Sequence, residues 1–252
     1  MSNKRFSIIT VTYNVDQVLE RTLKSIQSQT AFDSIEHIIV DGNSSDNTVS
    51  LIKQHESKIN QWISEPDKGL YDAMNKGIAM ATGDYVWFIN AGDEIYDKNT
   101  VENLLQFYDA NTTPDVLYGD TKEYTADGEE LGMRRLKVPK NLTWKSFKQG
   151  MLVCHQSIII KRDIAPKYNL DYAISADVDW VISALKQAKT IVNTHAILSK
   201  FEKGGLSGKH IKRALKERFA IMKKHYGLIN TTLHHFYFPL RLATFYIRNK
   251  RI

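Results

Sequence analysis

The chain has 252 residues, of which 42% are hydrophobic and 25% charged, the composition of an ordinary folded globular protein. Its formal net charge of +6 is unevenly spread, because Lys209 to Ile252 holds eleven Lys and Arg and one acid. The first 208 residues therefore have a net charge of −4, which argues against a nucleic-acid-binding protein.

Cysteine content and hydropathy point to a cytoplasmic protein. Cys154 is the only cysteine, so the sequence has no internal disulfide and fits a reducing compartment. No signal peptide precedes the first predicted strand. No window approaches the roughly 20 apolar residues that a membrane-spanning helix needs.

Strands and helices alternate through the first half of the chain. The pattern predicts strands at residues 6–12, 36–40, 61–64 and 85–89, and helices at 15–26, through Ile52, and at 71–81. Four such alternations predict an α/β fold with a mostly parallel central sheet, right-handed crossovers and flanking helices.

The second half alternates less regularly. We expect helices at 100–111, 143–150 and 175–188, strands at 115–118, 156–161 and 190–198, a hairpin turn at Asp127-Gly128 and a glycine loop at 201–207. A basic helix follows at 209–226, with a predicted apolar stripe of Ile211, Leu215, Phe219 and Met222. The remaining segment interleaves aromatic residues with arginines, which is typical of an interfacial amphipathic anchor.

Polar residues stand at the end of each predicted strand in the first half. These are Tyr13, Asp41, Asp67 and Asp93. Ligands of open α/β sheets bind at the carboxyl ends of the strands, so this half is predicted to bind a nucleotide. The sequence contains neither a phosphate-loop lysine motif nor G-x-G-x-x-G, which argues against kinase-like and dinucleotide sites.

Four ordered motifs resemble those of family 2 glycosyltransferases, the inverting enzymes with the GT-A fold. They are S-I-I-T-V-T-Y-N at 7–14, I-I-V-D-G-N-S-S-D-N-T at 38–48, A-M-N-K-G-I-A-M-A-T-G-D-Y-V-W-F-I-N-A-G-D at 73–93 and S-A-D-V-D-W at 175–180. The resemblance covers about residues 5–208. It implies a GT-A domain at 1–208, divided into a nucleotide-binding half (1–98) and an acceptor half (99–208), and a basic helical extension at 209–252.

The resemblance also implies a nucleotide-sugar site. Its residues would be Thr12, Tyr13, Asn14, Asp41, Asp67, Lys68, Asn75, Asn90 and Ala91. An ionised Asp41 accepts hydrogen bonds only, which suits the imide N–H of a uracil-like base, and Tyr13 would pack on that base. Thymine and guanine donors stay open.

Asp93 is the expected metal ligand, for Mg²⁺ or Mn²⁺ bridging the donor diphosphate. Two residues depart from the family pattern: Asn90 and Gly92 replace aspartates that the family commonly carries there. A non-catalytic relative that binds a nucleotide sugar is therefore the alternative to a transferase.

Asp177 is the expected general base, because inversion by direct displacement needs a base that takes the proton of the attacking hydroxyl. Asp179 is the alternative; two residues along a helix, it points elsewhere. The acceptor or diphosphate region would include His155, Gln156, Gly204, Gly205 and Ser207.

The implied function is transfer of one sugar from a nucleoside diphosphate sugar to a hydroxyl of a growing, lipid-linked, cell-surface glycan. The basic extension, residues 209–252, fits peripheral contact with the anionic inner face of the cell membrane, or packing on the body of the protein. A sugar nucleotidylyltransferase is disfavoured, because its G-x-x-x-R loop is replaced by Tyr13-Asn14-Val15-Asp16.

Overall fold

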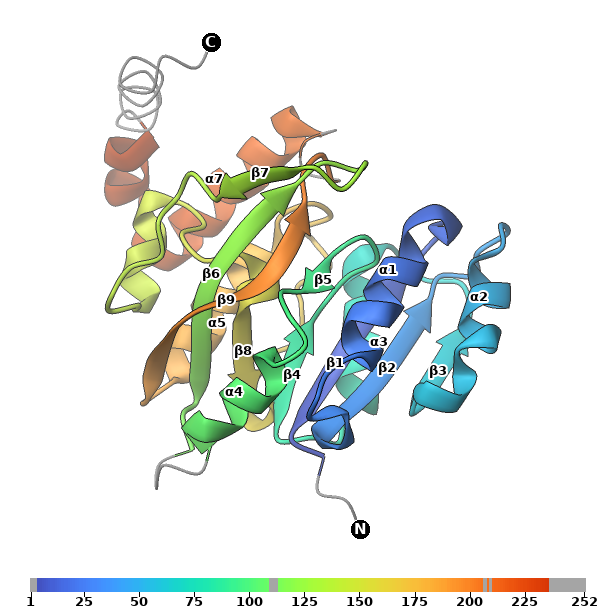
Figure 1. Cartoon of the computed structure of the whole chain (residues 1–252). Helices are drawn as coiled ribbons and strands as arrows, with labels where there is room; N and C mark the ends of the chain where they lie inside the picture. The colour runs from blue at the N-terminus through green and yellow to red at the C-terminus, as the bar shows by residue number, and fades with distance from the viewer. Residues whose placement is uncertain (1–3, 109–112, 206–207, 209, 236–252) are drawn as a thin grey trace.

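The structure is a computed structural model that describes residues 4–108, 113–205, 208 and 210–235. Its first half is the predicted parallel sheet: β1 (Phe6–Thr12), β2 (Ile35–Asp41), β3 (Gln61–Ser64) and β4 (Tyr85–Phe88). Three helices connect these strands, namely α1 (Asp16–Gln27), α2 (Thr48–Gln54) and α3 (Leu70–Met80) (Figure 1).

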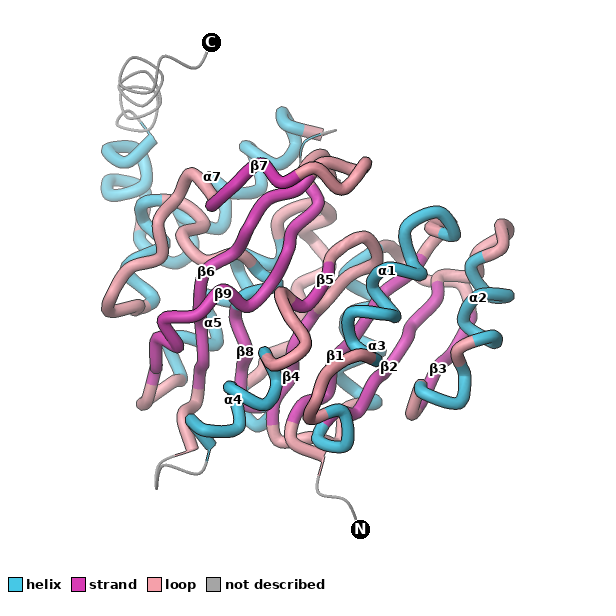
Figure 2. Tube along the Cα trace, viewed as in Figure 1, coloured by secondary structure: helices cyan, strands magenta, loops and turns pink. Residues whose placement is uncertain are grey.

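The second half extends the same sheet with mixed directions. It contains β5 (Glu94–Ile95), α4 (Thr100–Tyr108), β6 (Val116–Tyr124), β7 (Glu130–Met133), β8 (Ile158–Lys161), α5 (Ala176–Gln187), β9 (Ile191–Glu202) and α7 (Ile211–Tyr226). The strand order is β3-β2-β1-β4-β8-β6-β9-β5, with β7 paired to β6. β8 is antiparallel to β4 and β6, whereas β9 is parallel to β6. Figure 2 shows these strands side by side in one sheet.

Alternate residues of each central strand point to opposite faces of the sheet. Each strand therefore contributes side chains to both faces, and helices cover both of them. On β1, Phe6 and Ile8 pack in the apolar cluster that includes α4, whereas Ile9 and Val11 pack in the cluster of α3, α5 and α7. α1 and α2 enclose Ile39 of β2 on the α4 side. The result is a three-layer sandwich with a fully buried first strand.

The carboxyl ends of the first three strands are in register. Thr12 pairs with Asp41, and Asp41 pairs with Ser64. The polar residues predicted to share an edge therefore do so, at the end of the sheet where α1 and α3 begin.

Three second-half elements differ from the sequence prediction. β6 continues to Tyr124 and β9 to Glu202. The two strands pair with each other over most of their length, so both extend beyond the apolar residues that predicted them. The predicted helix at 143–150 is the 3-10 helix Trp144–Gln149. The hairpin turn at Asp127-Gly128 is confirmed, with Gly128 at φ 86° between β6 and β7.

The predicted apolar stripe of α7 is wrong in part. Ile211 and Leu215 are 60% and 54% exposed, whereas Ala214, Glu217, Ile221, Met222 and Tyr226 are buried. The helix is rotated because its acid, Glu217, is the acceptor for backbone N–H groups that precede α5. No helix in the described ranges is both long and apolar enough to cross a membrane.

Candidate functional site

A cleft of about 1000 Å³ opens beside the carboxyl end of β4. Seven of the residues predicted for the site line it: Asn90, Ala91, Asp93, His155, Gln156, Asp177 and Gly205. They come from the turn after β4, the segment before β8, the start of α5 and the loop after β9. The fold thus collects residues more than a hundred positions apart around one space.

Asp177 lies in the first turn of α5, where the helix dipole favours a carboxylate. It is half-buried on the cleft wall, and the Tyr71 hydroxyl of α3 donates a hydrogen bond to its Oδ1 at 3.2 Å. Asp179 faces away from the cleft, where Lys224 (3.1 Å) and His225 (2.6 Å) of α7 hold its carboxylate. Of the two candidate bases, Asp177 is the one that borders the cleft.

An aromatic cluster supports this wall. His155 stacks on Phe88 with ring centroids 5.1 Å apart, and its Nε2 lies 2.7 Å from the Tyr168 hydroxyl. Tyr168 stacks on Trp180 and on Tyr71. Burial lowers the pKa of His155 to about 4, although the charge of Asp177 acts in the opposite direction. The imidazole is therefore neutral at physiological pH and belongs to the packed floor of the cleft.

Asp93 is buried beneath the cleft and has a hydrogen bond to each carboxylate oxygen. The Gln156 amide donates to Oδ2 at 2.7 Å, and the Glu202 N–H donates to Oδ1 at 3.0 Å. Burial raises the pKa of Asp93 to about 8, and the Gln156 hydrogen bond and the Arg21 charge only partly oppose it. The Cys154 thiol in turn donates to Gln156 Oε1 at 3.0 Å, which fixes the amide.

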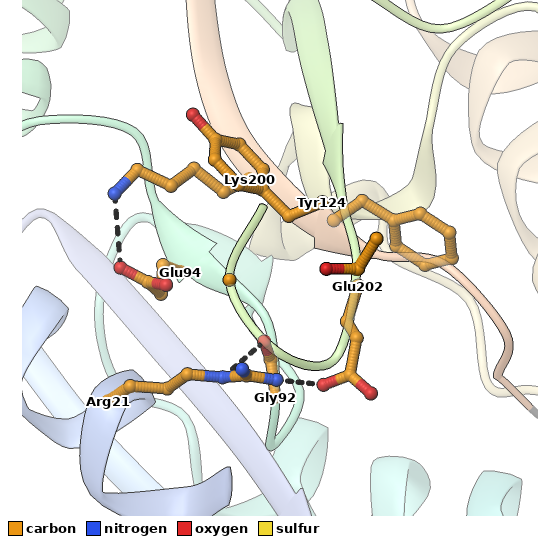
Figure 3. A pocket seen from close by; sticks show the side chains of 9 residues that line it. Arg21, Gly92, Glu94, Tyr124, Lys200 and Glu202 are labelled. Carbon is orange, nitrogen blue, oxygen red and sulfur yellow. Dashed lines mark hydrogen bonds and ion pairs between the residues drawn. The ribbon is translucent and has the colours of Figure 1, made fainter. Parts of the chain in front are cut away.

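A smaller pocket of about 90 Å³ lies behind the Asp93 turn, and Figure 3 shows its lining. Arg21 of α1 forms an ion pair with Glu202 there and donates to the Gly92 carbonyl at 3.1 Å. Gly92 has φ 96°, and a Cβ at this position would lie 2.8 Å from Glu202 Oε2. An aspartate here would be strained and would face a second carboxylate, which explains this departure from the family pattern.

The donors around Asp93 do not fit a divalent cation in this arrangement. Each of its oxygens already accepts an N–H group, and the burial that raises its pKa to about 8 favours the protonated acid, which is a poor ligand for Mg²⁺ or Mn²⁺. Elsewhere in the described residues, no cluster of three or more His, Cys, Asp or Glu side chains is placed to hold a metal ion. Asn90, which lines the cleft, offers one neutral oxygen: its Oδ1 is buried and has no hydrogen-bond partner among the residues that the structure describes.

Asp41 lies outside this cleft, buried at the shared strand edge. It accepts hydrogen bonds from the Thr12 hydroxyl (2.8 Å), the Ser44 N–H and hydroxyl (2.9 and 2.6 Å) and the Ser64 hydroxyl (2.7 Å). Burial alone would raise its pKa, but these hydrogen bonds outweigh it and lower the pKa. In this structure the carboxylate joins the ends of β1, β2 and β3, and a base contact stays a prediction.

Tyr13 and Asp67 flank the exposed surface above Asp41. Tyr13 is 64% exposed, and a Cβ on Gly42 would lie 2.4 Å from Asp67 Oδ2 and 3.3 Å from the Tyr13 ring. Glycine at position 42 therefore lets both side chains approach the backbone. Asn14 stands beside them and accepts the Ser45 N–H at 2.8 Å.

Three further predicted site residues, Asn75, Lys68 and Gly204, stand apart from the cleft or are engaged elsewhere. The Asn75 amide is held by both backbone groups of Tyr168, at 3.0 and 2.7 Å. Lys68 and Gly204 are exposed and do not line the cleft. Ser207 and the aromatic-arginine segment from 236 onward lie outside the described residues.

Sequence reasoning missed several side chains that line the cleft, chiefly Tyr71, Arg134, Arg135, Glu202 and Arg218. Only the Arg134-Arg135 pair after the hairpin had any local signal, as adjacent cations outside the basic extension. Arg218 was counted with the basic face of α7, because no sequence pattern told which side of that helix meets the cleft.

The family model for "Glycosyl transferase family 2" matches residues 7–168, well over half of the chain and including β1 to β8. The chain belongs to glycosyl transferase family 2. An uncharacterized glycosyltransferase of Mycobacterium tuberculosis is 29% identical to this family member over 252 residues, covering 97% of this chain and 93% of that protein. A PGL/p-HBAD biosynthesis glycosyltransferase of Mycobacterium bovis is 30% identical over 230 residues, covering 86% and 85%.

Solved structures show the same fold at low identity. Residues 1–349 of TarS from S. aureus, in complex with UDP-GlcNAc, superpose with a TM-score of 0.68 at 18% identity, covering 93% of this chain and 73% of that one. The mannosyltransferase PcManGT from Pyrobaculum calidifontis, in complex with GDP-Man and Mn²⁺, gives 0.62 at 16% identity, covering 91% and 73%. The predicted GT-A fold of this family 2 glycosyltransferase is confirmed.

Proposed function

We propose that this glycosyltransferase moves a sugar from a UDP-linked donor to a hydroxyl of a growing, lipid-linked, cell-surface glycan, with inversion. One observation carries the proposal: Asp177 borders the same cleft as Asn90 and Asp93. A base on one wall and the donor-binding turn on another leave room for an acceptor hydroxyl between them. A single displacement needs that arrangement.

Asp177 is the general base of the proposed reaction. Its carboxylate takes the proton of the acceptor hydroxyl as that oxygen attacks the anomeric carbon, and the nucleoside diphosphate leaves on the opposite face. The Tyr71 hydroxyl fixes the orientation of Asp177 Oδ1, because burial holds the pKa of Tyr71 well above its usual range and keeps its proton in place. The neutral, buried His155 forms part of the apolar floor beneath this base.

The donor base is proposed to lie over the edge formed by Tyr13, Asp41 and Asp67, with the sugar near Asn90. The exposed Tyr13 ring offers a stacking surface, and Asn90 Oδ1 offers an acceptor that no described residue uses. A structural neighbour that binds UDP-GlcNAc supports a nucleotide-sugar donor of the uridine class.

Mg²⁺ or Mn²⁺ at Asp93 stays a prediction. A neighbour that binds GDP-Man and Mn²⁺ supports divalent metal use in this fold, whereas the hydrogen bonds to both Asp93 oxygens argue against it here. No step of the proposed reaction depends on the ion.

A lipid-linked acceptor implies that the enzyme acts at the inner face of the cell membrane. A relative named for PGL/p-HBAD biosynthesis supports a role in glycan biosynthesis. Ile211, Leu228, Ile229 and Leu233 are 54–78% exposed near clustered lysines, which suits an anionic bilayer surface. We expect co-sedimentation with vesicles of 30% phosphatidylserine to fall at least about fivefold when Arg241, Arg248, Lys250 and Arg251 become serine. Unchanged sedimentation would exclude membrane contact through this segment.

The test of the function is a calorimetric and hydrolysis screen of the full chain against UDP-, GDP- and dTDP-sugars, each with Mg²⁺, Mn²⁺ or EDTA. We expect binding and slow hydrolysis of a UDP-sugar. Binding with no release of sugar under any condition would favour the alternative, a non-catalytic nucleotide-sugar-binding relative. Absence of binding by folded protein would contradict both functions.

A further inference from the structure

One face of α7 forms a wall of the cleft. Leu215, Arg218 and Met222 all line it, at positions three and seven residues apart that fall on one side of a helix. Leu215 is 54% exposed and Met222 is 4% exposed, so this face runs from the cleft rim into its interior with Arg218 between them. An arginine between two apolar side chains on a cleft wall is suited to bind an anionic group that is attached to an apolar group.

The Arg218 guanidinium has a buried donor that no described residue satisfies. Its Nε is buried and has no hydrogen-bond partner among the described residues. Glu217, the nearest acid in sequence, already accepts three backbone N–H groups and the Arg213 guanidinium. Lys224 and His225 share Asp179. Leaving a guanidinium donor buried and unpaired is costly, which points to a ligand that completes it.

The position of α7 assigns that ligand to the acceptor. α7 contacts α5, the helix that begins with Asp177, and Tyr226 stacks on Trp144 at 5.5 Å on the same side of the sheet. The edge of Tyr13, Asp41 and Asp67 belongs to β1, β2 and the loop after β3, at the other end of the strand order (Figure 1). A donor whose base lies on that edge enters the cleft from the side of β1, whereas α7 stands beside α5, the helix that carries the proposed base.

We propose that Arg218 binds a phosphate group of the acceptor, while Leu215 and Met222 contact an apolar segment joined to that phosphate. The planar guanidinium matches phosphate geometry, and the flanking apolar side chains favour a lipid phosphate over a phosphate within a glycan. This assignment rests on the proposed function, since it concerns the acceptor of the same cleft.

The test measures binding of octyl phosphate, octyl glucoside, sn-glycerol 3-phosphate and UDP to the full-length protein by calorimetry. The variants are Arg218→Gln, Arg218→Lys and Lys216→Gln; the last removes an exposed charge from the same helix and serves as the matched control. Circular dichroism verifies that each variant is folded. Wild-type protein is expected to bind octyl phosphate at least about tenfold more tightly than octyl glucoside or glycerol 3-phosphate.

Arg218→Gln is expected to weaken octyl phosphate binding at least about tenfold, Arg218→Lys about threefold, and Lys216→Gln less than twofold. UDP binding should stay within twofold of wild type in all three. Equal losses in Arg218→Gln and Lys216→Gln would overturn the assignment, as would a loss of UDP affinity that matches the loss for octyl phosphate. Wild-type protein that binds octyl phosphate through Arg218 but binds no UDP would contradict the proposed function and leave the phosphate site standing.

Discussion

Replacing Asp177 by asparagine is expected to lower the turnover of the nucleotide-sugar donor by about 10³-fold. The amide still accepts the Tyr71 hydrogen bond that the carboxylate accepts at 3.2 Å, so the local structure is kept. The amide is not basic, however, so no group is left to take the proton of the acceptor hydroxyl. Donor affinity should change less than about threefold, because the loss lies in the transition state. Turnover and donor Kd, measured on one preparation, separate the two effects.

Two further carboxylates serve as controls for Asp177. Asp171 is exposed in the preceding loop, and Asp171→Asn should leave turnover within about twofold. Asp179→Asn removes the partner of Lys224 and His225, so it should lower thermal stability more than turnover. A variant Asp177→Asn that keeps a tenth of wild-type turnover would exclude this residue as the base.

Replacing Glu217 by alanine is expected to cost about 3 kcal/mol of unfolding free energy and to lower turnover about tenfold. Its carboxylate accepts the N–H groups of Ala173 (3.1 Å), Ile174 (2.8 Å) and Ser175 (2.9 Å), and Asp177 follows two residues later. Without this acceptor three backbone donors lose their partner at the start of α5. Denaturant unfolding measures the first effect, with Glu20→Ala, an exposed charge on α1, as the control within about 0.5 kcal/mol.

The cost of losing Glu217 depends on pH in a defined direction. Burial alone would raise its pKa, but the backbone hydrogen bonds and the Arg213 contact lower it below the usual value. A carboxylate with a lowered folded-state pKa stabilises the fold above its unfolded pKa of about 4.3 and loses this contribution as the pH falls through the folded value. The difference between wild type and Glu217→Ala should therefore shrink below about pH 4. A difference that stays constant down to pH 3 would contradict an ionised Glu217.

The first half of the fold follows from the sequence because its strands are buried on both faces. Continuous apolar segments such as Tyr85 to Ile89 have one stable environment, and the turn residues after them mark the sheet edge. The placement of Asn90, Asp93 and Asp177 in one cleft was likewise predictable, since their motifs fix both the element and the end of that element.

The second half depends on contacts between distant segments, which leave no local pattern. β6 and β9 extend beyond their apolar cores because each supplies hydrogen-bond partners for the other. The apolar residues of α7 indicate a stripe that includes Leu215, yet Glu217 turns the helix by satisfying N–H groups more than forty residues away. Arg218 faces the cleft for the same reason, and its role could be inferred only from the structure.

Asn75 illustrates the limit of motif-based assignment. The family resemblance implies a donor contact, whereas both ends of its amide bind the backbone of Tyr168. Motif spacing identifies the residue but not the direction of its side chain. The resemblance likewise implies that Asp41 contacts the donor base, whereas its buried carboxylate accepts hydrogen bonds from Thr12, Ser44 and Ser64.

The central claim is a single displacement at the Asp177 cleft, and the anomeric form of the released sugar tests it most directly. Purified protein would hydrolyse UDP-GlcNAc, whose sugar is α-linked, while proton NMR records the first product before mutarotation. Water in place of the acceptor should give the β-anomer first, and Asp177→Asn should slow its appearance by about 10³-fold. Initial release of the α-anomer, or unchanged release from the Asp177→Asn variant, would contradict the account.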